Sequence, residues 1–175
     1  MESFLWIVLS YFIGAIPSGY IIGKVFYHVD LKKTGSGNIG ATNAYRELGV
    51  VAGLSVFICD FLKGFIAVHL GMPDPLIVLA CAIAAIVGND WSIFLHFKSG
   101  KGVACGVGAF AYISAPAVLC AFAVWLLVFK AKHIVSLSSI IAAPVVALVL
   151  LIEGASAEYV IFAALAAVIV IGKHK

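Results

Sequence analysis

Charged side chains are scarce in this sequence. Of its 175 residues only 11% are Asp, Glu, Lys or Arg, whereas 64% are hydrophobic. The mean hydropathy is +1.18. A soluble domain carries about a quarter charged residues, so this composition excludes an ordinary soluble protein. Apolar runs near the ~20 residues that cross a bilayer recur along the chain and predict an integral membrane protein.

Signatures of several soluble-enzyme chemistries are also missing. No H-E-x-x-H pattern indicates a metal site, and no G-x-S-x-G elbow indicates a serine hydrolase. The first apolar run, residues 3–26, is too long for a cleavable signal peptide and lacks its basic start. The cysteines form no C-x-x-C pair, which leaves packing as their expected role; they are Cys59, Cys81, Cys105 and Cys120. We therefore expect no metal, no cofactor and no nucleic-acid partner.

The longest polar stretch covers residues 34–46 and combines glycines with short polar side chains. Its glycines let the backbone turn tightly and approach a ligand, and its N–H groups suit a phosphate. The string G-x-G-x-x-G is also the dinucleotide fingerprint, but no strand or βαβ unit surrounds it. The alternative is a plain turn between two helices. Such a turn needs only glycine and does not explain the serine, threonine, asparagines and arginine of this stretch. The candidate site residues here are Gly35, Ser36, Gly37, Asn38, Gly40, Thr42, Asn43 and Arg46.

A second polar stretch, residues 97–102, superficially resembles a phosphate-binding P-loop. The Walker pattern fails because Leu95 stands where it needs glycine and Gly102 where it needs serine or threonine. Two lysines around a Ser-Gly turn can still hold an anion. The alternative is the ordinary enrichment of lysine in cytoplasmic loops, which does not explain the glycines. The candidate binding residues are Lys98, Gly100, Lys101 and Gly102.

Apolar segments predict the membrane helices. We expect helices at 3–26 with an interruption at Pro17, at 50–71, at 75–95, at 103–129, from about 135, and at 157–172. The segment 103–129 crosses once as a single helix or turns back at Ser114–Pro116. In the second case each half has about 13 residues and spans roughly 20 Å, against a hydrocarbon core of ~30 Å.

The distribution of basic residues decides between these two topologies. Ten of the eleven Lys and Arg residues lie in or beside 24–46, 98–101, 130–132 and 173–175. All four places share one face only if 103–129 turns back, and basic loops face the cytoplasm. We therefore predict an all-α integral membrane protein with seven transmembrane helices, two of them short. Its N-terminus lies outside and its C-terminus lies in the cytoplasm.

Two further polar features fall on predicted helices. Asp60 and Lys63 share one face of the helix at 50–71, where intramembrane charges normally face the bundle interior and pair. They either hold helices together or belong to a site. Ser136 and Ser138 lie in the first turn of the helix near 135, at the cytoplasmic end. Their hydroxyls either contact a ligand or satisfy carbonyls of their own helix.

These motifs, taken in order, closely resemble the bacterial acyl-phosphate:glycerol-3-phosphate acyltransferases, the PlsY family. The matching segments are 35–43 with Arg46, 60–64, 97–104, 135–139 and the final His174. The resemblance implies seven transmembrane helices and a single transmembrane acyltransferase domain over 1–175. It also implies acyl transfer from acyl phosphate to the sn-1 hydroxyl of glycerol-3-phosphate, which yields lysophosphatidic acid and phosphate for phospholipid synthesis. The family usually has His, Gly, Thr and Arg where this chain has Asn89, Ser99, Cys105 and His133.

The resemblance and the residue chemistry together assign roles. Arg46 and Lys101 are expected to clamp glycerol-3-phosphate, and the leaving phosphate to take the hydroxyl proton. The catalytic residues, which contact the acyl phosphate, its oxyanion or a phosphate, are Ser36, Thr42, Asn43, Ser136 and His174. The expected setting is the bacterial cytoplasmic (inner) membrane, with a monomer in the lipid bilayer and its site facing the cytoplasm. We also expect the chain to lack the C-terminal tail that follows His174 in the family.

Two other functions stay open on the sequence alone. Broken helices and intramembrane charges also mark transporters, so a small-anion transporter is one alternative. The absence of a convincing inverted repeat and the position of every glycine-rich loop on one predicted face argue against it. The other alternative is a catalytically impaired homologue that only binds lipid phosphates.

Overall fold

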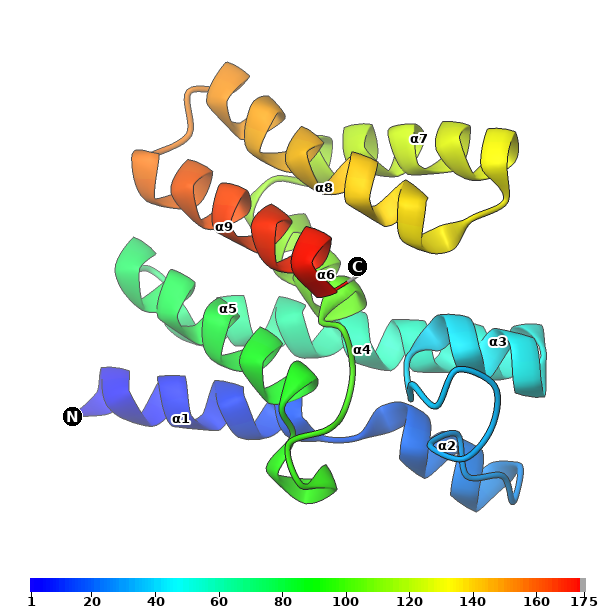
Figure 1. The fold of residues 1–175 in the computed structure, drawn as a ribbon. Coiled ribbons are helices and arrows are strands. Elements are labelled where there is room, and N and C mark those ends of the chain that lie inside the picture. The colour runs from blue at the N-terminus through cyan, green and yellow to red at the C-terminus, as the bar shows by residue number, and fades with distance from the viewer. Residues whose placement is uncertain (174–175) are drawn as a thin grey trace.

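The computed structural model describes residues 1–173, which form an all-helical bundle with no strand among them (Figure 1). Predicted spans largely match helices, and the segment 50–71 matches one helix from end to end. The elements are α1 (Glu2–Ala15), α2 (Ser18–Phe26), α3 (Ala41–Leu48), α4 (Val50–Gly71), α5 (Pro75–Asp90), the 3-10 turn η1 (Ile93–Leu95), α6 (Val103–Ile113), α7 (Ala115–Lys132), α8 (Val135–Ile152) and α9 (Ala157–Lys173).

The first apolar segment is broken into α1 and α2 at Pro17, as predicted. Proline lacks an N–H group and clashes with the preceding turn, so the helix cannot continue through it. The break leaves carbonyls at the end of α1 that two buried side chains satisfy. The Lys63 ammonium donates to the Ile16 carbonyl at 2.5 Å, and the Ser92 hydroxyl donates to the Ala15 carbonyl at 2.5 Å. Side chains from α4 and from the segment after α5 therefore hold this break in place.

Glycines allow α1, α4, α5 and α6 to pack closely. A methyl group at Gly14 would overlap the carbonyl of Ala85, so α1 and α5 approach there backbone to backbone. A methyl group at Gly64 would likewise overlap the carbonyl of Cys105, which joins α4 to α6. Small residues at contacts are the usual means by which membrane helices associate, because lipid supplies no hydrophobic force between them.

The apolar stretch 103–129 turns at Ser114, so the predicted turn at Ser114–Pro116 is confirmed. The two helices are not equal in length, in contrast to the predicted halves of about 13 residues each. The helices α6 and α7 contain 11 and 18 residues, so α7 continues through Lys132 into the basic loop. Ser114 accepts a hydrogen bond from the Ala117 N–H at 3.1 Å and caps α7. Its hydroxyl also donates to the Glu153 carboxylate at 2.7 Å, which ties this turn to the end of α8.

A second boundary differs from the prediction. The helix expected at 75–95 ends at Asp90, and a short 3-10 turn follows at Ile93–Leu95. The backbone is left-handed at both His96 and Phe97, with φ of 56° and 60°, which redirects the chain. Apolar composition continues past residue 90, so hydropathy alone places the helix end too late.

Among the described residues, five helical segments are long and apolar enough to cross a membrane: Glu2–Phe26, Val50–Gly71, Pro75–Leu95, Ala115–Lys132 and Val135–Ile152. Two shorter apolar helices, Val103–Ile113 and Ala157–Gly172, accompany them. Figure 1 shows the loop between α2 and α3 and the turn between α7 and α8 at the same end of the bundle. The N-terminus, the α4–α5 turn and the α8–α9 turn lie toward the other end (Figure 1).

Candidate functional site

The two polar stretches meet in an open pocket of about 430 Å³. The α2–α3 loop forms one wall, and the connection from α5 to α6 forms the other. Five predicted site residues line it, namely Ser36, Gly37, Asn38, Lys98 and Gly100. The remaining lining residues are Lys32, Asp90, Trp91, Phe97 and Ser99. The structure therefore brings together two segments that are about sixty positions apart in the sequence. If each segment were only a turn between two helices, the two would not need to meet.

Asn43 holds the α2–α3 loop in shape. Its buried side-chain amide donates to the carbonyls of Leu31, Thr34 and Asn38 at 3.3, 3.1 and 2.8 Å. Its carbonyl oxygen accepts the Ser36 N–H at 3.0 Å. These contacts use both ends of the amide, which offers two hydrogens and one acceptor oxygen. Asn43 therefore shapes the loop in this structure, and the substrate contact that the sequence suggests for it stays a prediction.

Glycine is required at two turns of this loop. Gly35 and Gly37 have φ of 55° and 71°, a left-handed conformation that side chains disfavour. Beneath them Leu31 and Ile39 are buried in a cluster with Val56 of α4, so apolar anchors hold both ends of the loop. The loop is thus fixed from below by packing and from within by the Asn43 amide.

The end of α5 holds the opposite wall. The Gly100 N–H donates to the Asn89 carbonyl at 2.9 Å, and a side chain at Gly100 would overlap the Asn89 amide. Gly102 has φ of 65°, and an added Cβ there would lie 2.8 Å from a carboxylate oxygen of Asp90. We call the segment 98–102 the lysine turn. Its two glycines, Gly100 and Gly102, are needed because the side chains of Asn89 and Asp90 pack directly against them.

Charge and hydrophobicity are unevenly distributed around the pocket. Lys32 and Lys98 are exposed, whereas the Asp90 carboxylate is buried. Cations at an open mouth suit an anionic group, and lysine is a common phosphate ligand. Trp91 and Phe97 add large exposed apolar surfaces to the same lining. An amphiphile with an anionic head and an apolar chain matches this combination.

Several predicted site residues do not line the pocket. Gly35 and Gly40 shape its loop, and the Gly40 N–H donates to the Asn38 side chain at 2.7 Å. Ser138 is buried in α8 and donates to the Ile134 carbonyl at 2.9 Å, so its hydroxyl satisfies its own helix, as the alternative interpretation held. The others outside the lining are Thr42, Asn43, Arg46, Lys101, Gly102 and Ser136. His174 lies outside the described residues.

Sequence reasoning missed half of the lining. The sequence predicts Trp91 within a helix, whereas Phe97 opens the second polar stretch without being a candidate site residue. The early end of α5 brings both side chains to the pocket. Lys32 stood among other basic residues beside the glycine stretch, and a wider window around that stretch would have included it. Within residues 1–173 no group of three or more His, Cys, Asp or Glu side chains is placed to hold a metal.

The chain matches known proteins over almost its whole length. The family model described as "Glycerol-3-phosphate acyltransferase" matches residues 4–175. The chain belongs to the glycerol-3-phosphate acyltransferase family. A glycerol-3-phosphate acyltransferase 2 from Moorella thermoacetica is 42% identical over 165 residues, which cover 93% of this chain and 85% of that protein. A glycerol-3-phosphate acyltransferase from Desulforudis audaxviator is 39% identical over 173 residues, covering 98% and 87%.

Solved structures agree with this acyltransferase assignment. A crystal structure of PlsY, an integral membrane glycerol 3-phosphate acyltransferase in its glycerol 3-phosphate form, is similar with a TM-score of 0.92 at 35% identity. The match covers 99% of this chain and 88% of that chain. The lysophosphatidic acid form of PlsY gives a TM-score of 0.91 at 33% identity, covering 100% and 89%. The acyltransferase described here is thus an all-helical integral membrane enzyme of phospholipid synthesis.

Proposed function

We propose that this acyltransferase moves a fatty acyl group from acyl phosphate to the sn-1 hydroxyl of glycerol-3-phosphate. The observation that carries the proposal is the pocket in which a glycine loop and a lysine turn face each other beside exposed aromatic side chains. Both substrates carry a phosphate, and one of them carries an acyl chain. A pocket with cations at its mouth and apolar side chains at its edge suits both features.

The reaction needs positioning more than it needs a protein nucleophile. An acyl phosphate is a mixed anhydride and is already activated. The sn-1 hydroxyl oxygen attacks the carbonyl carbon, the bond from that carbon to the phosphate oxygen breaks, and inorganic phosphate leaves with the proton. The protein must hold the hydroxyl about 3 Å from the carbonyl and stabilise the oxyanion and both phosphates.

The pocket suggests how this chain divides these tasks. Ser36 and the backbone of its loop receive the donor phosphate or the oxyanion, and Lys98 on the opposite wall neutralises charge. Arg46 on α3 and Lys101 are exposed and do not line the pocket, so their long side chains would close over glycerol-3-phosphate from outside. Thr42, Ser136 and His174 stay predicted contacts of the donor. Asn43 acts as a positioning residue for the loop.

The donor assignment is tested with purified protein in detergent or proteoliposomes. Palmitoyl phosphate with glycerol-3-phosphate should give lysophosphatidic acid and phosphate, and palmitoyl-CoA should give neither. Preference for palmitoyl-CoA would overturn the proposed donor. Phosphate exchange across vesicles without product would support the transporter alternative, and ligand binding without turnover would support the impaired homologue.

The roles of Arg46 and Ser36 are separable by kinetics. A guanidinium binds a phosphate with two parallel hydrogen bonds that a lysine cannot reproduce. Arg46→Lys should therefore lower kcat/KM for glycerol-3-phosphate by roughly 30- to 1000-fold, or about 2–4 kcal/mol, with little change in the KM for acyl phosphate. Ser36→Ala should instead lower kcat. Unchanged values for both substrates in Arg46→Lys would remove the proposed clamp.

We further propose seven transmembrane helices, with the N-terminus outside and the C-terminus in the cytoplasm of a bacterial inner membrane. The five long segments and two short apolar helices support this number. The hydrogen bond from Ser114 to Glu153 supports a shared outer end for the α6–α7 and α8–α9 turns. The basic loops then face the cytoplasm, where the pocket opens. We expect a monomer.

Cysteine labelling tests this topology. Cys59 and Cys120 are exposed and are first replaced by alanine. Lys33→Cys and Ala131→Cys should react with an impermeant maleimide only from the cytoplasmic side, and Ser156→Cys only from the outside. Labelling of positions 33 and 131 from opposite sides would contradict the seven-helix arrangement.

A further inference from the structure

The segment between α5 and the lysine turn at 98–102 has an irregular backbone and still exposes four large apolar side chains. Within residues 91–97, Ser92 and Leu95 are buried and anchor the segment. Isolated exposed apolar residues are ordinary, but a contiguous group of this size marks a contact surface. The exposed fractions are 41% for Trp91, 48% for Ile93, 55% for Phe94 and 56% for Phe97.

Contacts with α1 place this segment beside the middle of an apolar span. The Phe94 ring lies 6.4 Å from the Phe12 ring, and the Tyr11 hydroxyl donates to the Trp91 carbonyl at 3.0 Å. Phe12 is ten residues from the start of the span Glu2–Phe26. At a helical rise of 1.5 Å per residue that distance is about 15 Å, or half of a ~30 Å hydrocarbon core.

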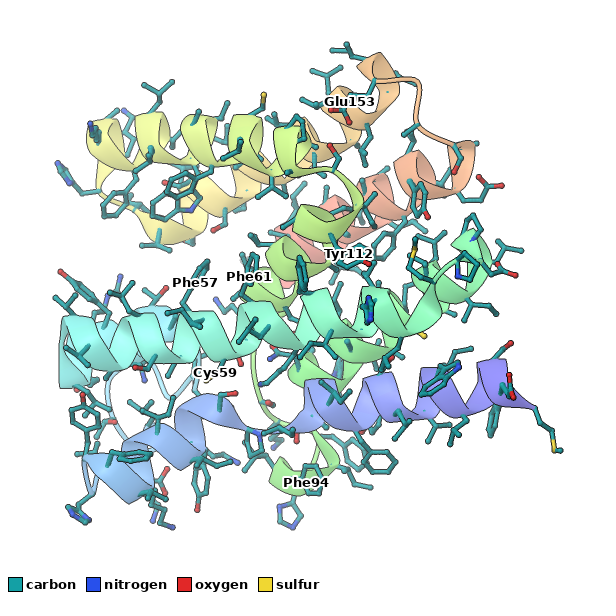
Figure 2. The ribbon with its side chains drawn as sticks, turned by 180° about the vertical axis from the view of Figure 1, so that it is seen from behind. Phe57, Cys59, Phe61, Phe94, Tyr112 and Glu153 are labelled. Atoms are coloured by element: carbon teal, nitrogen blue, oxygen red, sulfur yellow. The ribbon has the colours of Figure 1, made fainter. Side chains whose placement is uncertain are left out.

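The figures agree with this position. Figure 1 shows the turn of residues 91–97 beside the break between α1 and α2, not at an end of the bundle. Figure 2 shows Phe94 at the outer edge of the molecule, on the side away from α7 and α8. The exposed side chains therefore face outward at the depth at which α1 crosses the membrane.

The backbone of the segment suits an apolar environment. Irregular backbone is excluded from lipid because unsatisfied N–H and C=O groups cost several kcal/mol each. Here the N–H groups of Leu95 and Phe97 both donate to the Ser92 carbonyl, at 3.1 and 2.9 Å. The N–H groups of His96 and Lys98 donate to the carbonyls of Ile93 and Leu95, at 3.4 and 3.3 Å. The turn thus satisfies these groups internally.

We propose that residues 91–97 form a re-entrant turn whose four exposed apolar side chains contact the acyl chains of the bilayer. The surface is continuous with the lipid-facing side of α1 through Phe12, which is itself exposed. His96 is the exposed polar side chain of the turn and precedes Lys98 by two residues, where the chain returns to the pocket. An imidazole has an apolar body and a polar tip, which suits this transition.

The turn also places the active-site pocket next to lipid. Trp91 and Phe97 belong both to the exposed surface of the turn and to the lining of the pocket. The lipid contacts of Trp91 and Phe97 therefore help to fix one wall of the pocket, to which the next residue, Lys98, also belongs. If the turn were exposed to water, this wall would lack those contacts.

Tryptophan fluorescence tests the proposal without relying on activity. The chain has three tryptophans, so Trp6→Phe, Trp91→Phe and Trp125→Phe remove them all, and Phe94→Trp then adds a single reporter outside the pocket lining. In vesicles of lipids brominated on the acyl chains, this reporter should lose most of its emission, and aqueous iodide should leave it nearly unchanged. A matched reporter chain with Ile134→Trp in the same tryptophan-free background places tryptophan in the basic α7–α8 loop, where iodide should quench it. Strong quenching of the reporter at position 94 by iodide, or failure of the brominated lipids to quench it, would overturn the proposal.

A pair of charge substitutions gives a second measurement. Phe94→Asp and Ile134→Asp introduce the same charge at residues of similar exposure, 55% and 48%. Aspartate is strongly disfavoured in the centre of a bilayer and tolerated in a loop. Phe94→Asp should therefore reduce the yield of folded protein in membranes severalfold, whereas Ile134→Asp and Phe94→Leu should retain it. Equal yields for Phe94→Asp and Ile134→Asp would contradict a lipid contact.

Discussion

The helices α1, α4 and α5 differ from the α7–α8 hairpin in how their polar groups are used. Around the end of α1, buried side chains bond across segments: Lys63 of α4 donates to Ile16, and Ser92, just after α5, donates to Ala15. In α8 the hydroxyls of Ser138 and Ser139 donate to the carbonyls of Ile134 and Val135, four residues earlier in the chain. The hydrogen bonds that cross between α7 and α8, from Trp125 to Ser139 and from Ser114 to Glu153, stay within the hairpin. Only 11% of the α7 span is buried, against 44% of the span from Pro75 to Leu95.

This difference explains where the pocket is built. Its walls follow directly from α2 and α5, which the cross-helix bonds hold at the break in α1. The hairpin is attached mainly through apolar contacts, so its serines are free to satisfy their own helix without affecting the pocket walls. Polar residues that look alike in the sequence therefore differ in their effect on stability and activity. Substitutions in the two regions should show this difference.

The largest expected effect is the loss of stability in Asp60→Ala. The Asp60 carboxylate lies 2.6 Å from the Lys63 ammonium, and both side chains are almost fully buried. Removing one partner leaves an uncompensated buried charge, which typically destabilises by about 3–5 kcal/mol. Thermal unfolding in detergent should show a clear fall in Tm. The double substitution Asp60→Ala with Lys63→Met removes both charges and should recover part of it.

An unchanged Tm in Asp60→Ala would mean that the pair does not hold the break in α1. A fall that Lys63→Met fails to relieve would point instead to lost packing on α4. The comparison between the two parts of the bundle would then rest on apolar contacts alone.

A smaller effect is expected for Asn43→Ala. The substitution leaves three carbonyls and the Ser36 N–H without their side-chain partner. Unsatisfied buried groups cost about 1–3 kcal/mol each, and partial access to water should limit the total to about 2–4 kcal/mol. Because the loop forms one pocket wall, kcat/KM for both substrates should fall as well. Loss of activity for one substrate only would instead indicate direct contact with that substrate.

The smallest effect is expected for Ser138→Ala. Its hydroxyl bonds to the Ile134 carbonyl within α8, and that carbonyl also accepts the Ser138 N–H at 3.1 Å. Stability should change by less than about 1 kcal/mol, and steady-state kinetics should be unchanged. Ser136→Ala is the matched variant for a serine predicted to contact substrate. A kinetic defect in Ser138→Ala with normal Tm would place this serine in the site and remove the contrast between the two regions.

The sequence predicted much of the fold because hydropathy acts locally. Runs of apolar residues specify membrane helices whatever surrounds them, and proline ends a helix through its own ring. The breaks at Pro17 and at Ser114 were therefore predictable. The end of α5 at Asp90 was not, because apolar residues continue to residue 97 and only the contacts of Ser92 and Trp91 with α1 redirect the chain.

The candidate site divides in the same way. The sequence by itself determined the membrane setting, the glycine loop and the lysine turn, since these depend on composition and on the residue types that suit a phosphate. Only the tertiary structure decided that Trp91 and Phe97 line the pocket, that the Asn43 side chain bonds across its loop, and that the Ser138 hydroxyl donates to a carbonyl one turn earlier. A side chain's hydrogen-bonding capacity is fixed by its chemistry, but the partner that uses this capacity is fixed by which segments the fold brings together.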